Sequence, residues 1–316
     1  MKDTYGREIQ YLRLSVTERC NLRCRYCMPE EGICKKCHEE MLTEEEMIMA
    51  VKAAASLGVR KLRITGGEPL VKNNILSICA HVAAVDGIEE VCLTTNGILL
   101  PQLAKPLYDA GVDRVNISLD TLNEEKYAHI TRWGKLADAM KGLESALDAG
   151  FKKVKINSVL IGGFNDDEIA DMAELTKQYP VDVRFIELMP MYDGGELGKN
   201  AMIPCDVVLE KLPELMAEDC DGVARMYRLP GGIGRIGLIS PVSSHFCAEC
   251  NRIRLTADGM LRPCLHSPVE FAIKGLEFEG MRAQMEQAIF AKPICHDVLS
   301  EQSRSNAGRD MNRIGG

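Results

Sequence analysis

The chain has 316 residues, of which 46% are hydrophobic, and a formal net charge of −8 at pH 7. This length and composition can supply one barrel-sized core, and the acidic balance argues against a general nucleic-acid binder, whose surface is basic. No apolar run approaches the length of a membrane span, and the polar residues 1–10 lack the apolar region of a signal peptide. We therefore expect a cytoplasmic protein that binds neither membrane nor nucleic acid.

Short apolar runs alternate with helical stretches over the first 190 residues. Strands are predicted at 11–16, 61–65, 91–95, 114–119, 153–160 and 181–189, and helices at about 43–58, 101–110, 136–149 and 166–178. This order predicts an α/β fold with six strand–helix units of a parallel sheet. A full barrel of this type has eight units, so we predict a partial (β/α)6 barrel over residues 1–200.

The pattern changes after about residue 190, where glycine-rich turns separate shorter strand candidates. Strands are predicted at 224–229, 235–240 and 252–256, and Asp258-Gly259 predicts a hairpin turn after the last of them. We expect residues 201–299 to form a β-containing C-terminal region. Residues 300–316 are polar and are predicted to be a mobile tail that ends in Gly315-Gly316.

Thirteen cysteines in a chain without export signals favour thiols that bind metals over disulfides. Three of them, Cys20, Cys24 and Cys27, have the spacing C-x3-C-x2-C directly after the first strand; we refer to them as the first cysteine set. A structural zinc site normally has four ligands, whereas three thiolates leave one metal position open. A cubane iron–sulfur cluster with one free iron fits this pattern.

Polar and glycine-rich segments follow several of the predicted strands. In parallel strand–helix folds, ligands bind at the carboxyl ends of the strands, where the loops face one mouth. Each motif alone is more often a simple turn, but together with the first cysteine set they predict one shared site. The segments are Gly66–Pro69, Thr94–Gly97, Ser118–Asp120 and Glu187–Met189.

These motifs together resemble the radical S-adenosylmethionine (SAM) family. The resemblance implies that the first cysteine set holds a [4Fe–4S] cluster whose fourth iron binds SAM. It further implies that an external low-potential electron donor drives cleavage to a 5′-deoxyadenosyl radical, which removes a hydrogen atom from the substrate. SAM contacts are implied for Tyr26, Gly66, Gly67, Glu68, Ser118 and Met189.

A second group, Cys247, Cys250 and Cys264, has the spacing C-x2-C-x13-C; we refer to it as the second cysteine set. Together with His266 it could form a Cys3His zinc ribbon, and this stretch alone leaves zinc and a cluster about equally supported. Arg252 and Arg254 alternate on one strand face beside it. Such fork-shaped anion binders favour an open cluster that binds a base carrying phosphates.

Residues 234–265 resemble the C-terminal motif of the GTP 3′,8-cyclase family of molybdenum cofactor biosynthesis. This resemblance implies a second [4Fe–4S] cluster whose open iron binds the guanine of GTP. The radical would remove hydrogen from the ribose 3′ carbon, which then attacks carbon 8 of guanine. GTP contacts are implied for Arg13, Arg63, Thr94, Lys155, Arg252, Ile253 and Arg254, and catalytic roles for Arg184, Gly315 and Gly316.

Alternatives remain open from the sequence. Arg13, Arg63 and Lys155 could form surface ion pairs. The chain could be a radical SAM enzyme acting on a peptide, or a non-catalytic iron–sulfur or zinc scaffold.

Residues 34–38, "CKKCH", match the haem-attachment motif in an improbable context, and we assign them no function. A homodimer is a further expectation that the sequence leaves open.

Overall fold

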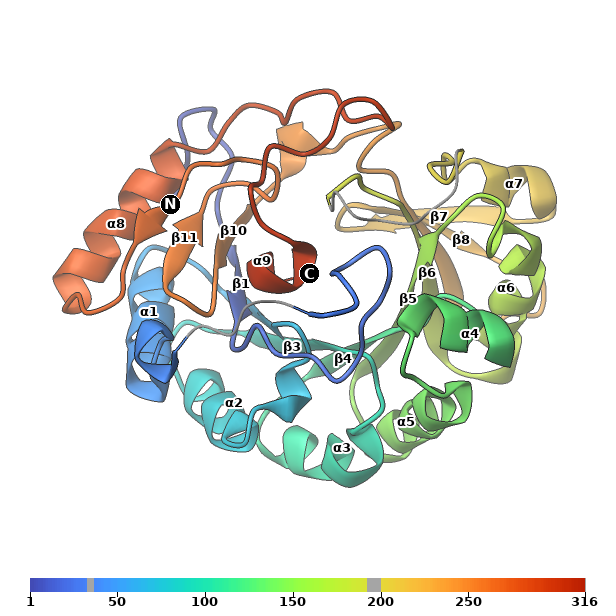
Figure 1. The fold of residues 1–316 in the computed structure, drawn as a ribbon, viewed down its shortest axis with the longest axis horizontal. Helices are drawn as coiled ribbons and strands as arrows, with labels where there is room; N and C mark the ends of the chain where they lie inside the picture. Colours follow the sequence, from blue (N-terminus) through green and yellow to red (C-terminus); the bar gives the residue numbers. More distant parts are fainter. Residues whose placement is uncertain (33–36, 192–199, 316) are drawn as a thin grey trace.

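The structure is a computed structural model that describes residues 1–32, 37–191 and 200–315, apart from the side chain of residue 38. Six parallel strands follow one another in chain order, and each is hydrogen-bonded to the next. This confirms the predicted partial (β/α)6 barrel, which curves around a central space (Figure 1). The strands are β1 (Tyr11–Ser15), β2 (Lys61–Thr65), β3 (Glu90–Thr95), β4 (Arg114–Ser118), β5 (Lys153–Leu160) and β6 (Val181–Glu187).

Helices cover the outer face of the curved sheet (Figure 1). Five of the α-helices, α2, α4, α7, α8 and α9, were not predicted from the sequence. The α-helices are α1 (Glu44–Ser56), α2 (Ile75–Ala83), α3 (Leu100–Asp109), α4 (Glu124–Thr131), α5 (Leu136–Asp148), α6 (Ile169–Gln178), α7 (Val207–Lys211), α8 (Phe278–Phe290) and α9 (Met311–Ile314). Short 3-10 helices are η1 (His38–Glu40), η2 (Pro69–Val71), η3 (Asp166–Glu168) and η4 (Cys247–Glu249).

The predicted capping box at the start of α1 is present. The Thr43 hydroxyl accepts a hydrogen bond from the Glu46 amide at 3.2 Å, and the Glu46 carboxylate accepts one from the Thr43 amide at 2.9 Å. Both interactions satisfy amide groups that the first helical turn leaves without partners. The helix therefore begins at the residue that the sequence indicates.

The C-terminal strands extend the same sheet at both of its edges. They are β7 (Met216–Asp221), β8 (Ala224–Arg228), β9 (Arg235–Ile239), β10 (Arg252–Leu255), β11 (Met260–Arg262) and β12 (Phe271–Ala272). On one edge β10 pairs in parallel with β1, and on the other β9 pairs in parallel with β6. The outer strands β12, β11, β8 and β7 are antiparallel to their neighbours. The sheet order is thus β12-β11-β10-β1-β2-β3-β4-β5-β6-β9-β8-β7.

Strand alternation separates the core from the central space. In β1, Leu12 and Leu14 are fully buried in the hydrophobic core, whereas Arg13 between them lines an internal cavity. Leu62 and Ile64 of β2 pack in the same core on either side of Arg63, which also lines the cavity. Successive side chains of a strand point to opposite faces, so an apolar outer face and a charged inner face share one strand.

The two cysteine sets lie at opposite ends of the strands. The first set follows the carboxyl end of β1, while Cys250 precedes the amino end of β10, which runs parallel to β1. Cys264 follows β11, which is antiparallel to β10, and so returns to the same end as Cys250. The barrel interior therefore separates the two sets. Among the described residues, no helix is both long and apolar enough to cross a membrane.

Close backbone packing positions the loop after β3. Gly142 of α5 lies against Gly97 of that loop, and a Cβ added at Gly142 would stand 2.1 Å from the Gly97 carbonyl oxygen. We predict that Gly142→Ala lowers the free energy of unfolding by about 1–3 kcal/mol, because the helix must move away from the loop. Chemical denaturation under anaerobic conditions measures this change.

Gly280→Ala in α8 is the matched control. A Cβ at this helical glycine would lie 3.3 Å from the Leu276 Cβ, a far longer distance than the one at Gly142. Alanine has the higher helix propensity, so this substitution is expected to be neutral or to stabilise by about 0.5–1 kcal/mol. Equal destabilisation by both substitutions would contradict the role given to the contact of Gly142 with Gly97.

Candidate functional site

A cavity of about 610 Å³ occupies the interior of the barrel. Its wall includes all three residues of the first cysteine set and all three of the second. Each of the six is a free, partly buried thiol. The cavity volume lies within the range of about 300–1,000 Å³ found for small-molecule sites. The structure therefore brings both incomplete ligand sets to one chamber.

The glycine loop after β2 supports the first cysteine set from behind. The Gly67 amide donates to the Thr17 carbonyl at 2.7 Å, and the Glu68 amide donates to the Arg19 carbonyl at 2.8 Å. A Cβ at Gly66 would lie 2.6 Å from the Thr17 carbonyl oxygen, and one at Gly67 would lie 2.4 Å from that of Arg19. Only glycine permits this approach, which holds the chain that enters the cysteine loop.

Glu68 connects this loop to the next strand. Its buried carboxylate accepts hydrogen bonds from the Leu70 amide at 3.0 Å, the Thr95 hydroxyl at 2.7 Å and the Asn96 amide at 2.7 Å. Burial raises the pKa of Glu68 to about 7, although the Asn96 and Thr95 hydrogen bonds oppose the shift. The carboxylate therefore holds the loop after β2 to the loop after β3.

Tyr26 is held by the loop after β4. Its hydroxyl donates to the Asp120 carboxylate at 2.8 Å, and the Val159 amide donates to the other oxygen of that carboxylate at 2.8 Å. Burial raises the pKa of Asp120 to about 6. Tyr26, Ser118 and Asp120 line the cavity beside the first cysteine set.

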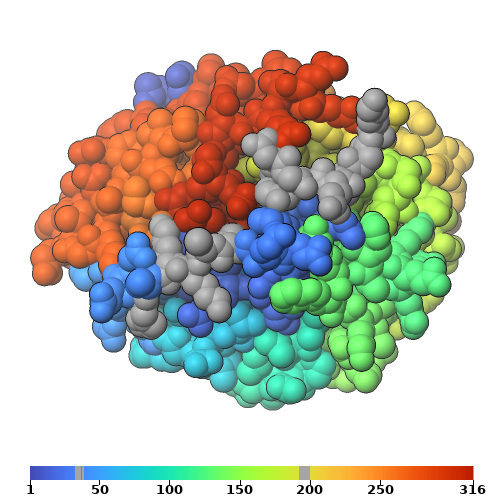
Figure 2. Space-filling model, in the orientation of Figure 1, coloured from blue at the N-terminus to red at the C-terminus, as the bar shows by residue number. Residues whose placement is uncertain are grey.

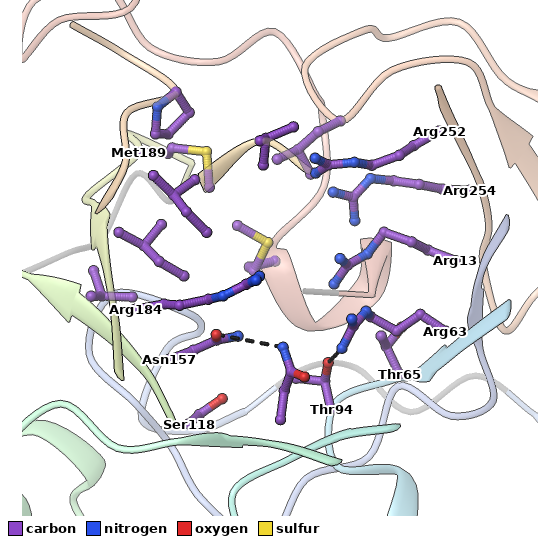
Figure 3. A pocket seen from close by; sticks show the side chains of 18 of the residues that line it. Arg13, Arg63, Thr65, Thr94, Ser118, Asn157, Arg184, Met189, Arg252 and Arg254 are labelled. Atoms are coloured by element: carbon purple, nitrogen blue, oxygen red, sulfur yellow. Dashed lines mark hydrogen bonds between the residues drawn. The ribbon is translucent and has the colours of Figure 1, made fainter. Parts of the chain in front are cut away.

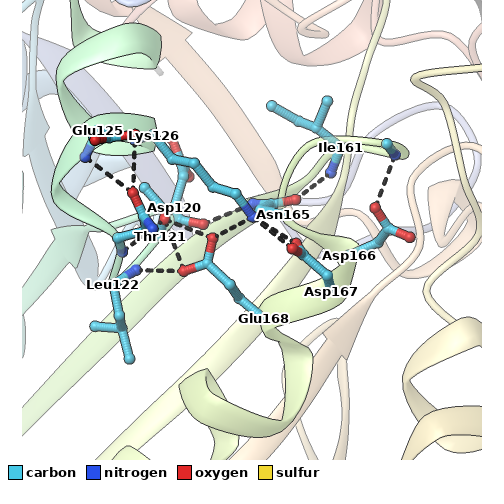
Figure 4. A network of polar contacts seen from close by, with 12 residues as sticks. Asp120, Thr121, Leu122, Glu125, Lys126, Ile161, Asn165, Asp166, Asp167 and Glu168 are labelled. Carbon is cyan, nitrogen blue, oxygen red and sulfur yellow. Dashed lines mark hydrogen bonds and ion pairs between the residues drawn. The ribbon is translucent and has the colours of Figure 1, made fainter.

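A polar network fixes the backbone at Asp120 (Figure 4). The Asn165 amide group donates to the Asp120 carbonyl at 2.7 Å and to the Val159 carbonyl at 2.9 Å. The Glu168 carboxylate accepts from the Thr121 hydroxyl at 2.7 Å. These groups are buried and satisfied, so they position Asp120 instead of binding a ligand themselves.

Three arginines form a row across neighbouring strands. The parallel register pairs Arg254 of β10 with Arg13 of β1, and Arg13 with Arg63 of β2. Residues paired in this way have side chains on the same face of a sheet. Figure 3 shows these three guanidinium groups and that of Arg252 pointing into the cavity from one wall, with Arg184 directed at them from the other.

Arg63 and Arg254 of this row are buried, Arg13 between them is half-buried, and its charge is repelled by both neighbours. Burial and the neighbouring Arg254 lower the pKa of Arg13, and burial and Arg252 lower that of Arg254 to about 10. Burial also opposes the charge of Arg63, but the adjacent Tyr11 hydroxyl raises its pKa on balance. For Tyr11, burial raises the pKa and Arg63 and Arg13 lower it more, to about 8. Like charges held in a low-dielectric wall favour binding of an anion.

Cationic side chains surround the second cysteine set. Buried Lys292 donates from its ammonium to the Arg252 and Pro263 carbonyls, each at 2.8 Å, and so joins the segments that carry Cys250 and Cys264. Burial raises the pKa of the Cys250 thiol, but Lys292 and Arg252 lower it more strongly. Such surroundings favour the thiolate, which is the form that binds metal.

The zinc alternative requires ligands that converge on one ion. Among the residues that the structure describes, no three His, Cys, Asp or Glu side chains are arranged to hold a single ion. Nδ1 of His266 lies 2.9 Å from the Ser305 hydroxyl. A cubane spreads its thiolates over different irons, so its ligands need not converge. Each cysteine set offers three thiols and leaves one metal position open, which fits a [4Fe–4S] cluster with one free iron.

The wall opposite the arginine row carries Arg184 and Asp221. Arg184 Nη2 lies 2.6 Å from the Asp221 carboxylate, which also pairs with the Lys155 ammonium. Lys155 is fully buried behind Asp221 and does not line the cavity itself. Ile253 likewise packs its side chain in the hydrophobic core. Of these predicted residues, the structure places only Arg184 on the cavity surface.

The C-terminal tail is folded into the barrel. Arg254 Nη1 donates to the Gly315 carbonyl at 2.5 Å, and the Asn312 side chain donates to the Glu18 carbonyl at 3.1 Å. Gly315 has φ +83°, and a Cβ there would lie 2.6 Å from the Thr65 hydroxyl. In Figure 2 these red residues meet the blue N-terminal residues at the centre of the face. The mobility predicted for the tail stays a prediction, and Gly316 lies outside the described residues.

Sequence reasoning missed several residues of this site. Tyr11, Asn157, Asp221 and Lys292 all line the cavity, but no motif singles them out. Tyr11 lay within a predicted strand, two residues before Arg13, and its inward position follows from that alternation. Lys292 and Asp221 come from a loop and a hairpin end whose placement depends on tertiary contacts. The Cys34–Lys36 part of "CKKCH" lies outside the described residues.

Two family models match the chain in sequence. The Radical SAM superfamily model matches residues 14–176, and the Molybdenum Cofactor Synthesis C model matches residues 181–297. The chain is 49% identical over 321 residues to the GTP 3′,8-cyclase of Alkaliphilus oremlandii (strain OhILAs), and 48% identical over 328 residues to that of Pelotomaculum thermopropionicum (strain DSM 13744 / JCM 10971 / SI). Both alignments cover 100% of each chain.

Solved structures share the fold at low sequence identity. Streptococcus suis SuiB aligns with a TM-score of 0.65 at 12% identity, covering 91% of this chain and 67% of SuiB. HydG, a maturase of the [FeFe]-hydrogenase, aligns with a TM-score of 0.52 at 16% identity, covering 66% of this chain and 49% of HydG. At these low identities, the alignments show that the fold is shared and nothing further.

The packing of Gly67 predicts a selective defect. Gly67→Ala pushes the Arg19 carbonyl away and displaces the first cysteine set, while the second set is untouched. Iron per reconstituted chain should fall from about eight toward about four, as expected for loss of one of two cubanes. Gly280→Ala should keep the full iron content. An unchanged iron content in Gly67→Ala would show that the loop contact does not position the cysteines.

Proposed function

This chain belongs to the GTP 3′,8-cyclase family of radical SAM enzymes, and from that premise we propose how its residues bind and orient GTP. The enzyme converts GTP to (8S)-3′,8-cyclo-7,8-dihydroguanosine 5′-triphosphate, the first step of molybdenum cofactor biosynthesis. The observation that carries our assignment of roles is one cavity with a cysteine set at each end and an arginine row between them.

The first cysteine set would hold one [4Fe–4S] cluster and the second set another. When bound, the clusters and SAM supply one-electron reduction and hydrogen-atom abstraction. The remaining work of the chain is to hold SAM and substrate in place. Tyr26, Ser118 and Met189 line the cavity and would contact SAM. The backbone of Gly66, Gly67 and Glu68 shapes the loop beside it.

The triphosphate is proposed to lie between the arginine row and Arg184, which is directed at the row from the facing wall (Figure 3). A polyphosphate offers several oxygens to the guanidinium groups of Arg13, Arg63 and Arg254, which form strong charge-assisted hydrogen bonds with phosphate. Thr94 is part of this surface, because its hydroxyl accepts from Arg63 Nη1 at 3.0 Å. With the guanine at the second cysteine set and the phosphates on the row, the ribose is held in the middle of the cavity. This restraint favours the intramolecular bond, because both reacting carbons belong to one bound molecule.

Three predicted residues have indirect positions in this proposal. The charge of Lys155 would attract the triphosphate from behind Asp221. The backbone of Ile253 would hold Arg252 and Arg254 in position. Gly315 reaches the site through its hydrogen bond from Arg254. Catalytic roles for Arg184, Gly315 and Gly316 remain part of the proposal.

The proposal includes an external electron donor of low potential, because the reaction begins with one-electron reduction. A homodimer and a cytoplasmic location are further predictions. Sedimentation of the reconstituted protein tests the first, and fractionation of cells tests the second.

Anaerobic turnover tests the substrate. We predict that reconstituted protein with SAM, a strong reductant and GTP forms 5′-deoxyadenosine together with the cyclised nucleotide, both measured by chromatography. ATP in place of GTP should give no cyclised product, because a different base meets the second cysteine set. Equal deoxyadenosine without GTP, and no cyclised nucleotide with it, would contradict the substrate assignment. Cys264→Ser should still cleave SAM but lose cyclisation.

The pKa values of the cavity predict a pH dependence for GTP binding. Tyr11 has a pKa lowered to about 8 as described above, and burial together with Arg184 lowers that of Lys155 to about 8. As pH rises through 8, Tyr11 gains a negative charge and Lys155 loses a positive one, so both changes weaken attraction of the triphosphate. The dissociation constant of GTP should rise about threefold to tenfold between pH 7.5 and 8.7.

Two controls separate the causes of this dependence. Guanosine, which has no phosphate, should bind equally at both pH values. Tyr11→Phe should show a smaller rise than the parent chain, since only the Lys155 contribution remains. Parallel pH curves for GTP and guanosine would refute the assignment of these groups to the phosphate side.

A further inference from the structure

The end of strand β7 brings a carboxylate into an otherwise cationic part of the cavity. Among the described strands, β7 is the outermost of its edge of the sheet, pairs with β8, and is largely exposed. Its register against β8 is irregular between Glu218 and Asp221. The following Gly222 has φ +64° and turns the chain into β8. Asp221 and Gly222 both line the cavity. An edge hairpin of this kind can move without disturbing the barrel strands.

Asp221 is the counter-ion of Lys155 and Arg184, the two cations of the wall that faces the arginine row. Its carboxylate pairs with the Lys155 ammonium, lies 2.6 Å from Arg184 Nη2, and lies 3.7 Å from Arg235 Nη2. The Asp221 side chain remains 30% exposed, whereas that of Lys155 is 0% exposed. The lysine is thus enclosed, while its partner faces the cavity.

A second carboxylate near Lys155, that of Asp182, is held in a fixed position. Asp182 of β6 accepts from Arg235 Nε at 3.1 Å and from Nη2 at 2.9 Å, and lies 3.4 Å from Lys155 Nζ. It belongs to a central strand and is 11% exposed. Lys155 therefore keeps one acidic neighbour if Asp221 leaves, whereas Arg184 loses its ion pair at 2.6 Å and keeps the weaker attraction of Asp182.

We propose that the Asp221 carboxylate is a displaceable counter-ion, which holds Lys155 and Arg184 in ion pairs until the triphosphate of the substrate takes its place. The inference rests on the proposed function for the identity of the anion. Asp221 is a positioning residue in this arrangement: it keeps two cations aligned in the empty cavity, and it opposes ligands that lack enough charge to displace it. Binding of the anion then releases the end of the β7–β8 hairpin.

Anion binding to the reconstituted full chain tests this inference, with inorganic tripolyphosphate, GTP and guanosine as probes at pH 7. Asp221→Asn removes the competing charge but keeps the shape, so tripolyphosphate and GTP should bind about tenfold more tightly. Guanosine should bind with unchanged affinity. Weaker or unchanged tripolyphosphate binding by Asp221→Asn would overturn the proposal, and so would an equal gain for guanosine.

Asp219→Asn is the matched control, because Asp219 is an exposed residue of the same strand and the substitution removes the same charge. It should alter tripolyphosphate affinity by less than twofold. A tenfold gain in this variant as well would assign the effect to net charge and reject a specific role for Asp221.

Hydrogen exchange on the parent chain gives a result that does not depend on any variant folding. Saturating tripolyphosphate should increase amide exchange in residues 216–228, whereas saturating guanosine should leave exchange there unchanged. Protection or no change with tripolyphosphate would count against displacement. The outcome is separate from that of the turnover assay. If the chain binds tripolyphosphate as predicted but does not cyclise GTP, GTP is rejected as substrate and the displacement of Asp221 is kept. If the chain cyclises GTP but tripolyphosphate has none of the predicted effects, the substrate is kept and the displacement is rejected.

Discussion

The parallel pairing of β10 with β1 is the constraint on which the site depends. It continues the barrel sheet across a gap of more than 230 residues in sequence, and its register sets Arg254 beside Arg13. The same pairing places Cys250 at the amino end of the strands, while the first cysteine set follows their carboxyl end. A shift by one residue would turn Arg252 and Arg254 into the apolar core and Ile253 into the cavity. Ligand geometry and charge placement therefore share one structural cause.

Several of the cationic groups in and around the cavity are buried. Cationic groups line the chamber in numbers that a protein interior tolerates only with compensating partners. Tyr11, the Gly315 carbonyl and Asp221 each provide part of that compensation to a different arginine. In the function proposed above, a polyanionic ligand would take over part of this compensation. An acidic protein with a net charge of −8 can thus bind an anionic nucleotide, because the local field of the cavity differs from the global charge.

Local patterns predicted much of the fold. The strands β1 to β6 and the start of α1 were identified because alternation, capping and glycine stops are encoded within a few residues. Helix α2 was missed because its N-cap, Asn74, makes no side-chain capping bond and its sequence is apolar around most of its surface. Strand β7 was missed because it is exposed and acidic and lacks an apolar alternation, and among the described strands it pairs with β8. Such elements depend on tertiary contacts that short-range patterns do not contain.

The sequence by itself determined the chemistry available: two sets of three thiols, a glycine loop, and basic residues at alternating strand positions. Spacing along the chain determines these features, since a C-x3-C-x2-C loop and an R-x-R strand are local. Only the tertiary structure decided that the two sets share one chamber, that Lys155 lies behind Asp221, and that Lys292 joins the segments of Cys250 and Cys264. These relations join residues up to 244 positions apart, from Cys20 to Cys264. Strand register and burial set them, and no local pattern specifies either.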